Sequence, residues 1–467
     1  MKIQQLYTNC LAQGAYYIAH KGEAVIIDPL RETKPYLDLL AANKDQLKYV
    51  FETHFHADFV SGHVDLALET GATIVFGPKA KTDYASHVAK DGEEFKVGDL
   101  TIKVLHTPGH TLESSTFLLQ DENLRPLCIF TGDTLFIGDV GRPDLAIKSD
   151  LTQEDLAGML YESLRNKIMP LPDDVIVYPA HGAGSACGKS MSKDTFDTLG
   201  SQKKNNYALA DISKAEFIKQ LTEGILPAPQ YFAKNAALNK AGYDAYEQVI
   251  ARGRKGLSAV EFKTAIAEKD ALVLDVRPAQ EFAAAHIPGS LFIGLDGQFA
   301  PWVGTIIRDL STPIYLVCPT GKEEETIMRL ARVGYDQCRA FLHGGFGDWK
   351  EAGLETASIE SISAAEFMVR YAQGVRTLDV RKPGEHDSAR LAKAENKPLD
   401  FIYEWMDQID PHSPVLIHCA GGYRSMITAS LLKANGHSAL TDVQGGFGAI
   451  SKLPAAEKEL MKECTNA

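Results

Sequence analysis

Imidazole and carboxylate side chains follow apolar runs at four places in the N-terminal half of this chain. The stretch THFHADF, residues 53–59, carries three of them, and TPGH, TGD and PAHG carry one each. Together they are His54, His56, Asp58, His110, Asp133 and His181. Nitrogen and oxygen ligands without a thiolate suit zinc or iron. One such histidine would more simply be a hydrogen-bonded core or surface residue, but this many at predicted strand ends predict a metal site.

The elements that must position these side chains have the pattern of an α/β domain. The runs LKYVFETH, LTIKVLHTPGH, PLCIFTGD and DDVIVYPAHG are predicted strands that end in polar clusters. The run AYYIAHKGEAVIIDP predicts two strands joined at a Lys-Gly turn, hence a β-hairpin. Helical patterns such as LTQEDLAGMLYESLRNKIM lie between some of the strands. Functional groups at strand ends are held rigidly by a scaffold of this kind.

The motifs THFHAD, TPGHT, TGDTLF and PAHG also carry a resemblance to a known family. In their order and spacing, residues 1–245 resemble the metallo-β-lactamase fold family, which implies an αββα sandwich of two sheets with helices outside. Hydrolases of the glyoxalase II type in that family hold two metal ions, with the counterpart of Asp133 as the bridge. Their second ion takes the counterparts of Asp58, the next residue and His181. The next residue here is Phe59, which binds no metal, so a complete second site is not expected.

A single ion held by His54, His110 and Asp133 would have a 2-His-1-carboxylate ligand set with open positions. That ligand set is diagnostic of non-heme Fe(II) oxygen chemistry. His56 is either a fourth ligand or, together with Asp58, part of the hydrogen-bonded shell around the ligands. His181 belongs to the same possible outer shell. We expect one Fe(II) per chain, with zinc as the ion that a misloaded protein would hold.

Two further side chains lie near this predicted site in the sequence. Arg142, in DVGRPDL, could bind an anionic carboxylate or phosphate of a substrate through its fork of donors. An ion pair with Asp144 or Asp139 explains the same residue equally well. Cys187 follows His181 in a Gly/Ser loop and could approach the metal pocket, although a small buried thiol is the simpler role.

The C-terminal half of the chain contains two copies of one pattern. LVLDVRPAQEF at 272–282 recurs as RTLDVRKPGEH at 376–386, and HGGFGDW at 343–349 recurs as QGGFGAI at 444–450. A repeat of about 100 residues is long enough to be a domain. Each copy alternates apolar strands with helices, which predicts a parallel sheet with helices on both faces. The polar segment 246–256 is the expected linker before the first copy.

In the second copy, a cysteine stands where a strand gives way to a helix. The stretch PVLIHCAGGYRSM places Cys419 at the helix entrance, where backbone N–H groups and the helix dipole favour a thiolate. Arg424 adds a positive charge, and Gly421, Gly422 and Tyr423 form the rest of the cradle for an anionic substrate. A cysteine phosphatase shares this chemistry but has one more residue between Cys and Arg. The Cys-x-x-Gly-x-Arg loop, LDVR and GGF resemble the rhodanese sulfurtransferase family across both copies.

The first copy keeps the cysteine but lacks the positively charged arginine beside it. Its loop is CPTGKE, so Glu323 replaces the arginine and two more glutamates follow. These carboxylates stabilise a helix N-terminus, repel an anionic sulfur species and raise the pKa of Cys318. We therefore expect the first copy to be a scaffold or docking domain and the second to be catalytic.

Composition limits the class of protein. The chain has 467 residues, 45% of them hydrophobic and 23% charged, which is typical of a multidomain globular protein. The net charge of −13 argues against nucleic-acid or anionic-membrane partners. No apolar run approaches the roughly 18–20 residues that span a bilayer, and no secretory signal is visible. Seven scattered cysteines favour reduced thiols and a cytoplasmic location.

Together, these features predict an α/β multidomain protein. Its expected parts are a metallo-β-lactamase-like domain at 1–245, a degenerate rhodanese domain at 257–357 and a catalytic rhodanese domain at 360–467. This arrangement resembles fusions of a persulfide dioxygenase with rhodanese. The resemblance implies oxidation of a low-molecular-weight thiol persulfide by O₂ to thiol and sulfite. Cys419 would then transfer sulfane sulfur to sulfite to give thiosulfate, with Arg424 holding the anion. It also implies a homo-oligomer, and the carrier thiol is left open.

Two other functions are compatible with parts of the sequence. A zinc thioester hydrolase of the glyoxalase II type would need a complete two-metal site, and Phe59 argues against it. A non-catalytic persulfide sensor or sulfur carrier would use the metal structurally. The complete CAGGYR loop beside open metal positions makes this third reading the weakest.

Overall fold

The computed structural model describes residues 1–145, 151–225, 227–457 and 459–462. Two compact units are present in it. The first comprises residues 1–248 with 304–308 and 330–336, and the second comprises 249–303, 309–329 and 337–467. None of the helices in the described part of the chain is long and apolar enough to cross a membrane.

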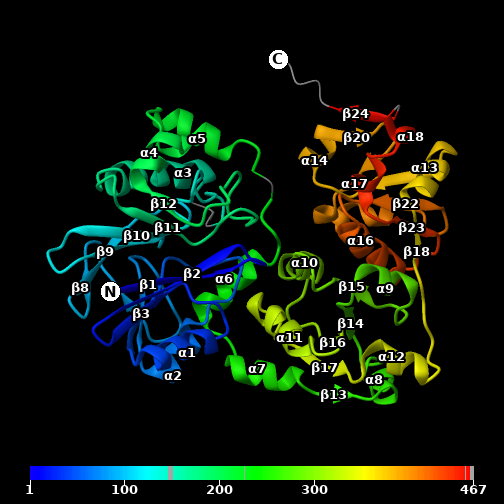
Figure 1. Ribbon diagram of the computed structural model, residues 1–467, viewed down its shortest axis with the longest axis horizontal. Coiled ribbons are helices and arrows are strands. Elements are labelled where there is room, and N and C mark those ends of the chain that lie inside the picture. Colours follow the sequence, from blue (N-terminus) through cyan, green and yellow to red (C-terminus); the bar gives the residue numbers. More distant parts are fainter. Residues whose placement is uncertain (146–150, 226, 458, 463–467) are drawn as a thin grey trace. The chain divides into compact units, whose positions relative to one another are not determined.

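The first unit is built on two six-stranded sheets (Figure 1). The strands of the first sheet, in spatial and chain order, are β1 (Lys2–Thr8), β2 (Gln13–His20), β3 (Glu23–Ile27), β4 (Gln46–Glu52), β5 (Thr73–Phe76) and β6 (His87–Val88). The second sheet contains β7 (Glu94–Val97), β8 (Leu100–His106), β9 (Ser115–Gln120), β10 (Pro126–Gly132), β11 (Ile176–Pro179) and β12 (Asp197–Thr198). The predicted hairpin is confirmed, since β2 pairs antiparallel with β3 across Lys21 and Gly22, both at positive φ.

Side chains that alternate along these strands make three apolar layers. Inward-facing residues of both sheets, such as Phe51 and Phe117, pack face to face in one core. The outer face of the first sheet is covered by α1 (Lys34–Asn43) and α2 (His63–Thr70). The outer face of the second is covered by α3 (Gln153–Ser163), α4 (Leu199–Asn205) and α5 (Lys214–Thr222). The predicted αββα sandwich is therefore confirmed, and α6 (Phe232–Ala241) and α7 (Tyr246–Gly253) follow it.

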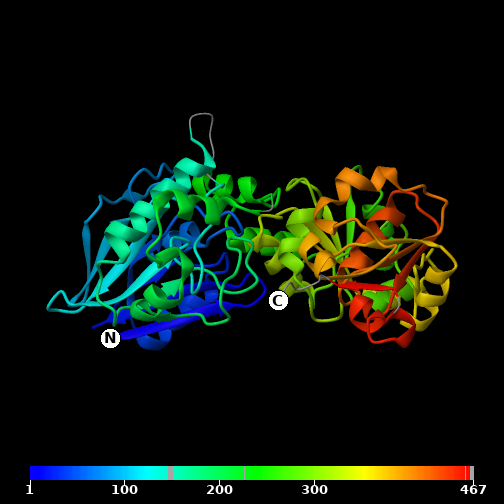
Figure 2. The same ribbon diagram turned by 90° about the horizontal axis from the view of Figure 1, so that it is seen from above.

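The second unit holds two five-stranded sheets whose strand pairs are all parallel, as the two repeats predict (Figure 1, Figure 2). The first repeat contains β13 (Gly256–Leu257), α8 (Ala259–Ala265), β14 (Leu272–Asp275), α9 (Ala279–Ala284), β15 (Leu291–Phe292), α10 (Phe299–Ile306), β16 (Ile314–Val317), α11 (Glu323–Arg332), β17 (Cys338–Leu342) and α12 (Gly345–Glu351). Its sheet order is β13-β17-β16-β14-β15.

The second repeat uses the same order, β18-β23-β22-β19-β21. Its elements are β18 (Glu360–Ile362), α13 (Ala364–Ala372), β19 (Arg376–Asp379), α14 (Pro383–Ser388), β21 (Glu395–Asn396), α15 (Ile402–Trp405), β22 (Val415–His418), α16 (Tyr423–Ala434), β23 (Leu440–Val443), α17 (Gly446–Ile450) and α18 (Pro454–Glu457). A separate ribbon pairs β20 (Ala389–Leu391) with β24 (Leu460–Lys462). The last residues of the parallel strands lie at one edge of each sheet. Cys318 directly follows β16 at this edge of the first sheet, and Cys419 directly follows β22 at this edge of the second.

Candidate metal centre and sulfurtransferase site

The predicted metal ligands converge at the ends of β4, β8 and β10. His54 and Asp133 lie one or two residues beyond their strands, and His110 lies in the loop after β8. All three side chains are buried, and each offers one ligand atom to a group whose members lie within 4.8 Å of one another. The Oδ2 atom of Asp133 is 3.4 Å from His110 Nε2 and 3.9 Å from His54 Nε2. These three residues are the ligand set expected from the sequence.

Hydrogen bonds on the far side of each ring direct its Nε2 toward this group. His110 Nδ1 lies 2.8 Å from the carbonyl oxygen of Arg142, which only accepts, so this nitrogen carries the proton. His54 Nδ1 lies 3.0 Å from Thr53 Oγ1, and that hydroxyl donates to Asp28 Oδ2 at 2.9 Å. Burial holds the pKa of His54 well below its usual range. In both imidazoles the hydrogen bond at Nδ1 thus leaves Nε2 to face the ligand group.

Two observations indicate that a cation belongs at this point. Neither carboxylate oxygen of Asp133 has a hydrogen-bond partner within the described residues, although the side chain is fully buried. A buried carboxylate without partners is costly, and a metal ion would satisfy it. The backbone at Gly141 lies very close to two of the ligand residues. A Cβ there would stand 2.1 Å from the Asp133 carbonyl oxygen and 2.9 Å from His110 Nδ1. The backbone therefore closes tightly around the ligands.

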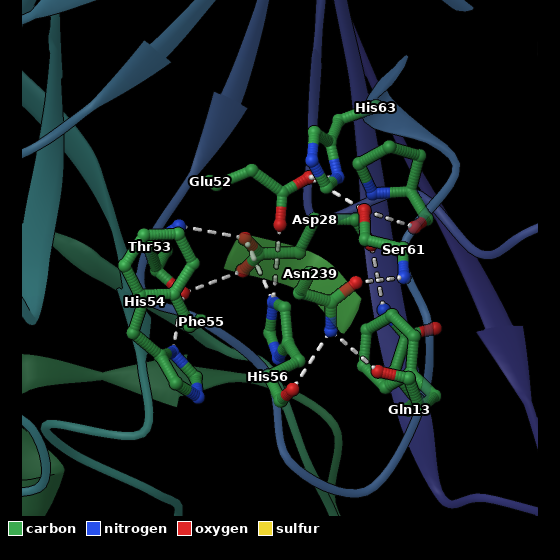
Figure 3. Close-up of polar contacts among 12 residues, drawn as sticks. Gln13, Asp28, Glu52, Thr53, His54, Phe55, His56, Ser61, His63 and Asn239 are labelled. Carbon is green, nitrogen blue, oxygen red and sulfur yellow. Dashed lines mark hydrogen bonds and ion pairs between the residues drawn. The ribbon is translucent and has the colours of Figure 1, made fainter. Parts of the chain in front are cut away.

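The imidazole of His56 lies beside that of His54, with the ring centroids 4.2 Å apart, and has one nitrogen against two carboxylates (Figure 3). Its Nε2 lies 3.1 Å from Asp28 Oδ1 and 3.7 Å from Glu52 Oε2. The phenyl ring of Phe59 stacks on it, with the ring centroids 4.4 Å apart and the planes 31° from parallel. Burial raises the pKa of Glu52 well above its usual range, and Asp28 adds to the effect. His56 also forms a group with Asp58 and His181 whose ligand atoms lie within 4.8 Å of one another, so both alternatives from the sequence, a ligand or part of the outer shell, stay open.

The remaining predicted residues form a second cluster around His181. Its Nε2 lies 3.4 Å from Asp58 Oδ2 and 3.7 Å from Asp133 Oδ1. Burial opposes protonation, but these two carboxylates raise the pKa of His181 well above its usual range. Cys187 is buried and joins His181 and Asp133 in a group within 4.8 Å, so this thiol does approach the metal pocket. Burial, reinforced by the carboxylates, raises the pKa of Cys187 to about 12.

Asn239, on α6, holds the loop that carries His56 and Phe59 (Figure 3). Its Nδ2 donates to the carbonyl oxygens of His56 at 2.7 Å and Phe59 at 2.8 Å. Its Oδ1 accepts from the N–H of Ser61 at 2.9 Å. This residue was missed in the sequence because it lies about 180 positions from its partners. Asp28 was missed too, although it ends the run AVIID much as Asp133 ends IFTGD.

Arg142 adopts the ion pair that the sequence left as an alternative to substrate binding. Its Nε and Nη2 donate to the two oxygens of Asp144 at 2.6 and 2.7 Å. The neighbouring cavity, about 560 Å³ in volume, is bounded by residues that flank the ligands, including Phe55, Ala57 and Thr111. One wall is formed by Phe232, three alanines and Lys240 of α6. The cavity therefore gives an organic molecule a mostly apolar approach to the metal group.

The loop after β22 has the geometry of a nucleophile cradle. Cys419 is 1% exposed, and its Sγ accepts from the N–H of Gly422 at 3.1 Å and from the hydroxyl of Ser425 at 3.5 Å. Gly422 stands at φ 99°, which lets its N–H turn inward at the start of α16. Arg424 donates to both oxygens of Glu385, at 2.6 and 2.8 Å, so the charge expected to hold an anion is largely offset.

The first repeat contributes to this second-repeat site. A cavity of about 360 Å³ at Cys419 is lined by Gly421, Tyr423 and Arg424 together with Gln298 and Trp302 of the first repeat. The hydroxyl of Tyr423 donates to the carbonyl oxygen of Gly294, also in the first repeat, at 2.6 Å.

The thiol of the first repeat has a different environment. Burial raises the pKa of Cys318 well above its usual range, with a smaller contribution from Glu323. Its Sγ lies 3.6 Å from Thr326 Oγ1. The direction of the pKa change agrees with the sequence prediction, but burial is a larger cause than the glutamates.

Comparison with known proteins supports both halves of this description. The Metallo-beta-lactamase superfamily profile matches residues 9–181, and the Rhodanese-like domain profile matches residues 258–352 and 363–453. The human mitochondrial persulfide dioxygenase ETHE1 is 33% identical over 210 residues, which are 44% of this chain and 74% of that protein. The bovine enzyme is 32% identical over the same length. A crystal structure titled metallo-beta-lactamase from Staphylococcus aureus is 30% identical, with a TM-score of 0.65, and covers 73% of this chain and 98% of its own.

Fold and motifs together define a metallo-β-lactamase superfamily domain followed by two rhodanese-like domains. Within this class, the chain belongs to the persulfide dioxygenase family.

Proposed function

We propose that the N-terminal unit oxidises a low-molecular-weight persulfide with O₂ to the thiol and sulfite, using one Fe(II) held by His54, His110 and Asp133. The observation that carries this proposal is the buried His-His-Asp group with unpaired Asp133 oxygens, set beside a second cluster in which Phe59 supplies no ligand. Family membership supports the same reaction. Iron in such a ligand set supplies open positions for O₂ and a substrate sulfur.

The protein's own contribution to this reaction would be orientation and exclusion of water. Thr53 and the Arg142 carbonyl fix the protonated nitrogen of each imidazole. Asn239 fixes the loop that carries His56. The cavity bounded by Phe55 and α6 would take the organic part of the persulfide and leave its terminal sulfur at the metal group. Because Arg142 is paired with Asp144, which lines this cavity, we do not assign Arg142 as an anion receptor.

We propose that the second repeat transfers sulfane sulfur. The Cys419 thiolate attacks the outer sulfur of a second persulfide, the S–S bond breaks, and the carrier leaves as its thiolate. Sulfite then attacks the outer sulfur of the cysteine persulfide, which gives thiosulfate and restores the Cys419 thiolate. Gly421, Gly422 and Tyr423 would cradle the sulfur, with Gly422 supplying an N–H. Arg424 would share its charge between Glu385 and the anion.

The first repeat is proposed to be a scaffold for this transfer. The cysteine of this repeat has a raised pKa and stands beside carboxylates at a helix entrance. The repeat also contributes two side chains to the lining of the Cys419 cavity. On this proposal the functional boundaries are 1–245 for the dioxygenase domain, 257–357 for the scaffold repeat and 360–467 for the transferase repeat. Cys318→Ser should leave thiosulfate production within about twofold of wild type, whereas Cys419→Ser should abolish it.

The decisive experiment measures oxygen uptake by Fe(II)-loaded protein given glutathione or coenzyme A persulfide, with sulfite and thiosulfate quantified. The expected result is O₂ consumption with thiosulfate as product, replaced by sulfite in Cys419→Ser. Absence of uptake with both persulfides, together with zinc-dependent cleavage of a glutathione thioester, would reject the dioxygenase in favour of a hydrolase. The observation that favours the hydrolase as a second candidate is the close approach of Asp133, His181 and Cys187.

A further inference from the structure

A short part of the first repeat belongs to the compact unit that holds the metal group. Residues 330–336, called here the α11 turn, comprise the end of α11 and the four residues that follow it. They lie within the sequence of the first repeat, yet they group with residues 1–248. The first repeat therefore supplies part of the first unit.

The α11 turn contacts the loop after β4 directly. The N–H of Val60, a fully buried residue, donates to the carbonyl oxygen of Arg332 at 2.7 Å. Asn239 binds the groups on either side, which are the carbonyl oxygen of Phe59 and the N–H of Ser61. A buried N–H without an acceptor is costly, so this stretch of loop depends on two supports, one on α6 and one on the α11 turn.

The same loop carries side chains of the candidate metal centre. Asp58 Oδ2 lies 3.4 Å from His181 Nε2, and Phe59 stacks on His56. His56, Asp58 and His181 offer ligand atoms that lie within 4.8 Å of one another. A displacement of the backbone at Val60 would therefore move groups that adjoin the metal ligands.

The side chain of Arg332 joins the α11 turn to the segment after β3. Its Nε lies 3.1 Å from both carboxylate oxygens of Glu32, and its Nη2 donates to the same carboxylate. Arg332 is 8% exposed and Glu32 is 7% exposed. Loss of the guanidinium would leave the buried carboxylate without this opposite charge, which is strongly unfavourable.

A second ion pair of reversed polarity lies beside the first. Arg31 is fully buried, and its Nη2 donates to Asp336 Oδ2 at 3.0 Å. Its guanidinium also lies over the ring of Tyr243, 4.1 Å from the centroid. Two adjacent residues, Arg31 and Glu32, thus face opposite charges four positions apart in the α11 turn. Exchange of the two contacts would bring like charges together, so the pairs specify one register between the segments.

The segment that receives these ion pairs is itself bonded to the metal-site loop. The N–H of Gly62 and the hydroxyl of Ser61 both donate to the carbonyl oxygen of Pro29, at 3.1 and 2.8 Å. A Cβ on Gly62 would stand 2.3 Å from the carbonyl oxygen of Leu30. The α11 turn, residues 29–32 and the loop therefore form one closed set of contacts.

This arrangement distinguishes the two repeats. The end of α16 and the residues after it, LKANGHS at 432–438, contain no acidic residue, so the pair of opposite charges found at 332 and 336 is not repeated there. The copy whose nucleophile loop has lost its arginine is thus the copy that contacts the metal-site loop.

We propose that the α11 turn positions the metal centre, with Arg332 as the residue that holds the loop carrying His56 and Asp58. The first repeat then supports the metal site of the first unit as well as the Cys419 cavity. The inference rests on the metal site proposed for the first unit, and it adds a requirement for residues from another domain of the chain.

The test compares Arg332→Ala with Arg329→Ala in the full-length protein. Arg329 lies on the same helix and donates to the carbonyl oxygen of Leu295 and to Glu325, so its removal controls for damage to α11. Arg332→Ala should speed amide hydrogen exchange in the peptide covering residues 56–62 by at least about tenfold. It should also weaken Fe(II) binding, measured by competition with a chelator, by about 10- to 100-fold. Arg329→Ala should change both quantities by less than about twofold.

A double-mutant comparison tests whether Arg332 acts through its partner. Glu32→Ala should reproduce the faster exchange and weaker iron binding, and the double variant should lose no more than the larger single loss, because each single change already breaks the pair. Additive losses would overturn the assignment of Arg332 as a residue that acts through Glu32.

Unchanged exchange and iron affinity in Arg332→Ala would overturn the inference. Faster exchange throughout the first unit, without a larger effect at residues 56–62, would also overturn it, since Arg332 would then contribute only general stability. If Arg332→Ala does not fold, Glu32→Gln, which keeps the side-chain shape, takes its place, and unaltered exchange in that variant rejects the idea. Amide exchange requires neither persulfide nor O₂, so these outcomes are distinguishable from a failure of the proposed oxidation.

Discussion

The phenyl ring of Phe59 stacks on His56, and the imidazole it covers has its Nε2 3.1 Å from Asp28 Oδ1. A histidine at position 59 would place a ligand beside Asp58 and His181, whose side chains already lie close together. On the proposed function, one residue thus has two effects, because it withholds a ligand from the second cluster and packs against His56. On this proposal, the choice between one metal ion and two depends, at the residue scale, mainly on this ring.

Phe59→His should therefore convert the site toward a two-metal centre. We expect the zinc-reconstituted variant to bind about two ions per chain in place of one, and the iron-loaded variant to lose at least about tenfold in O₂ uptake. Metal content by mass spectrometry and oxygen electrode rates measure the two effects. Phe59→Leu, which is apolar and cannot bind metal, is the control and should stay at one ion. Equal metal content in both variants would contradict this role for Phe59.

At the scale of single elements, α6 supports the metal site through Asn239. Its three hydrogen bonds join this helix to the loop after β4. Asn235, one turn earlier on the same helix, is equally buried, but its side-chain amide makes no hydrogen bond within the described chain. The two residues therefore form a natural pair for separating helix packing from loop positioning.

Asn239→Ala should leave buried backbone groups of the loop unpaired and lower the free energy of unfolding by about 3 kcal/mol. It should also weaken iron binding by about 10- to 100-fold, because the ligands' outer shell loses its support. Chemical denaturation and competition with a chelator measure these changes. Asn235→Ala, which removes no hydrogen bond seen here, should change iron affinity by less than about twofold. A comparable loss in both variants would show that α6 acts by packing alone.

The sequence predicted the regular elements well for a physical reason. Strand alternation and repeated motifs are local, so the sandwich, the parallel sheets and the convergence of His54, His110 and Asp133 could be anticipated. Asn239 could not, because its role depends on partners about 180 positions away. The pairing of Arg424 with Glu385 was missed for the same reason. Long-range partners of polar side chains are set by tertiary packing, which a single sequence does not display.

Another element-scale contact joins the two repeats at Tyr423. A Cβ on Gly297 would stand 2.3 Å from the ring of Tyr423. Only glycine at this position of the first repeat therefore leaves room for the tyrosine. Gly297→Ala should displace Tyr423 and lower sulfur transfer to sulfite by about tenfold, with oxygen uptake unchanged. Gly347→Ala, where a Cβ meets nothing within 4 Å, is the matched control. Equal transfer rates in the two variants would show that Tyr423 does not depend on the first repeat.

At the scale of the whole molecule, the proposed function places two reactions on one chain and links them through a small anion. On the proposed function, sulfite leaves the first unit as product and enters the second as sulfur acceptor. The ligands at the metal group and the cradle at Cys419 belong to different compact units and share no residue. Each half-reaction should therefore persist when the other is disabled, provided that its missing reactant is added.

Metal removal tests this independence directly. Treatment with a strong chelator, followed by desalting, should abolish O₂ uptake while transfer of sulfur from glutathione persulfide to added sulfite stays within about twofold of the untreated rate. Cys419→Ser should show the reverse, with uptake retained and thiosulfate absent. Restoring Fe(II) should recover uptake, because the two histidines are held by contacts that do not involve the ion. Loss of sulfur transfer on chelation, with the fold intact by circular dichroism, would instead show that the transferase repeat depends on the occupied metal site.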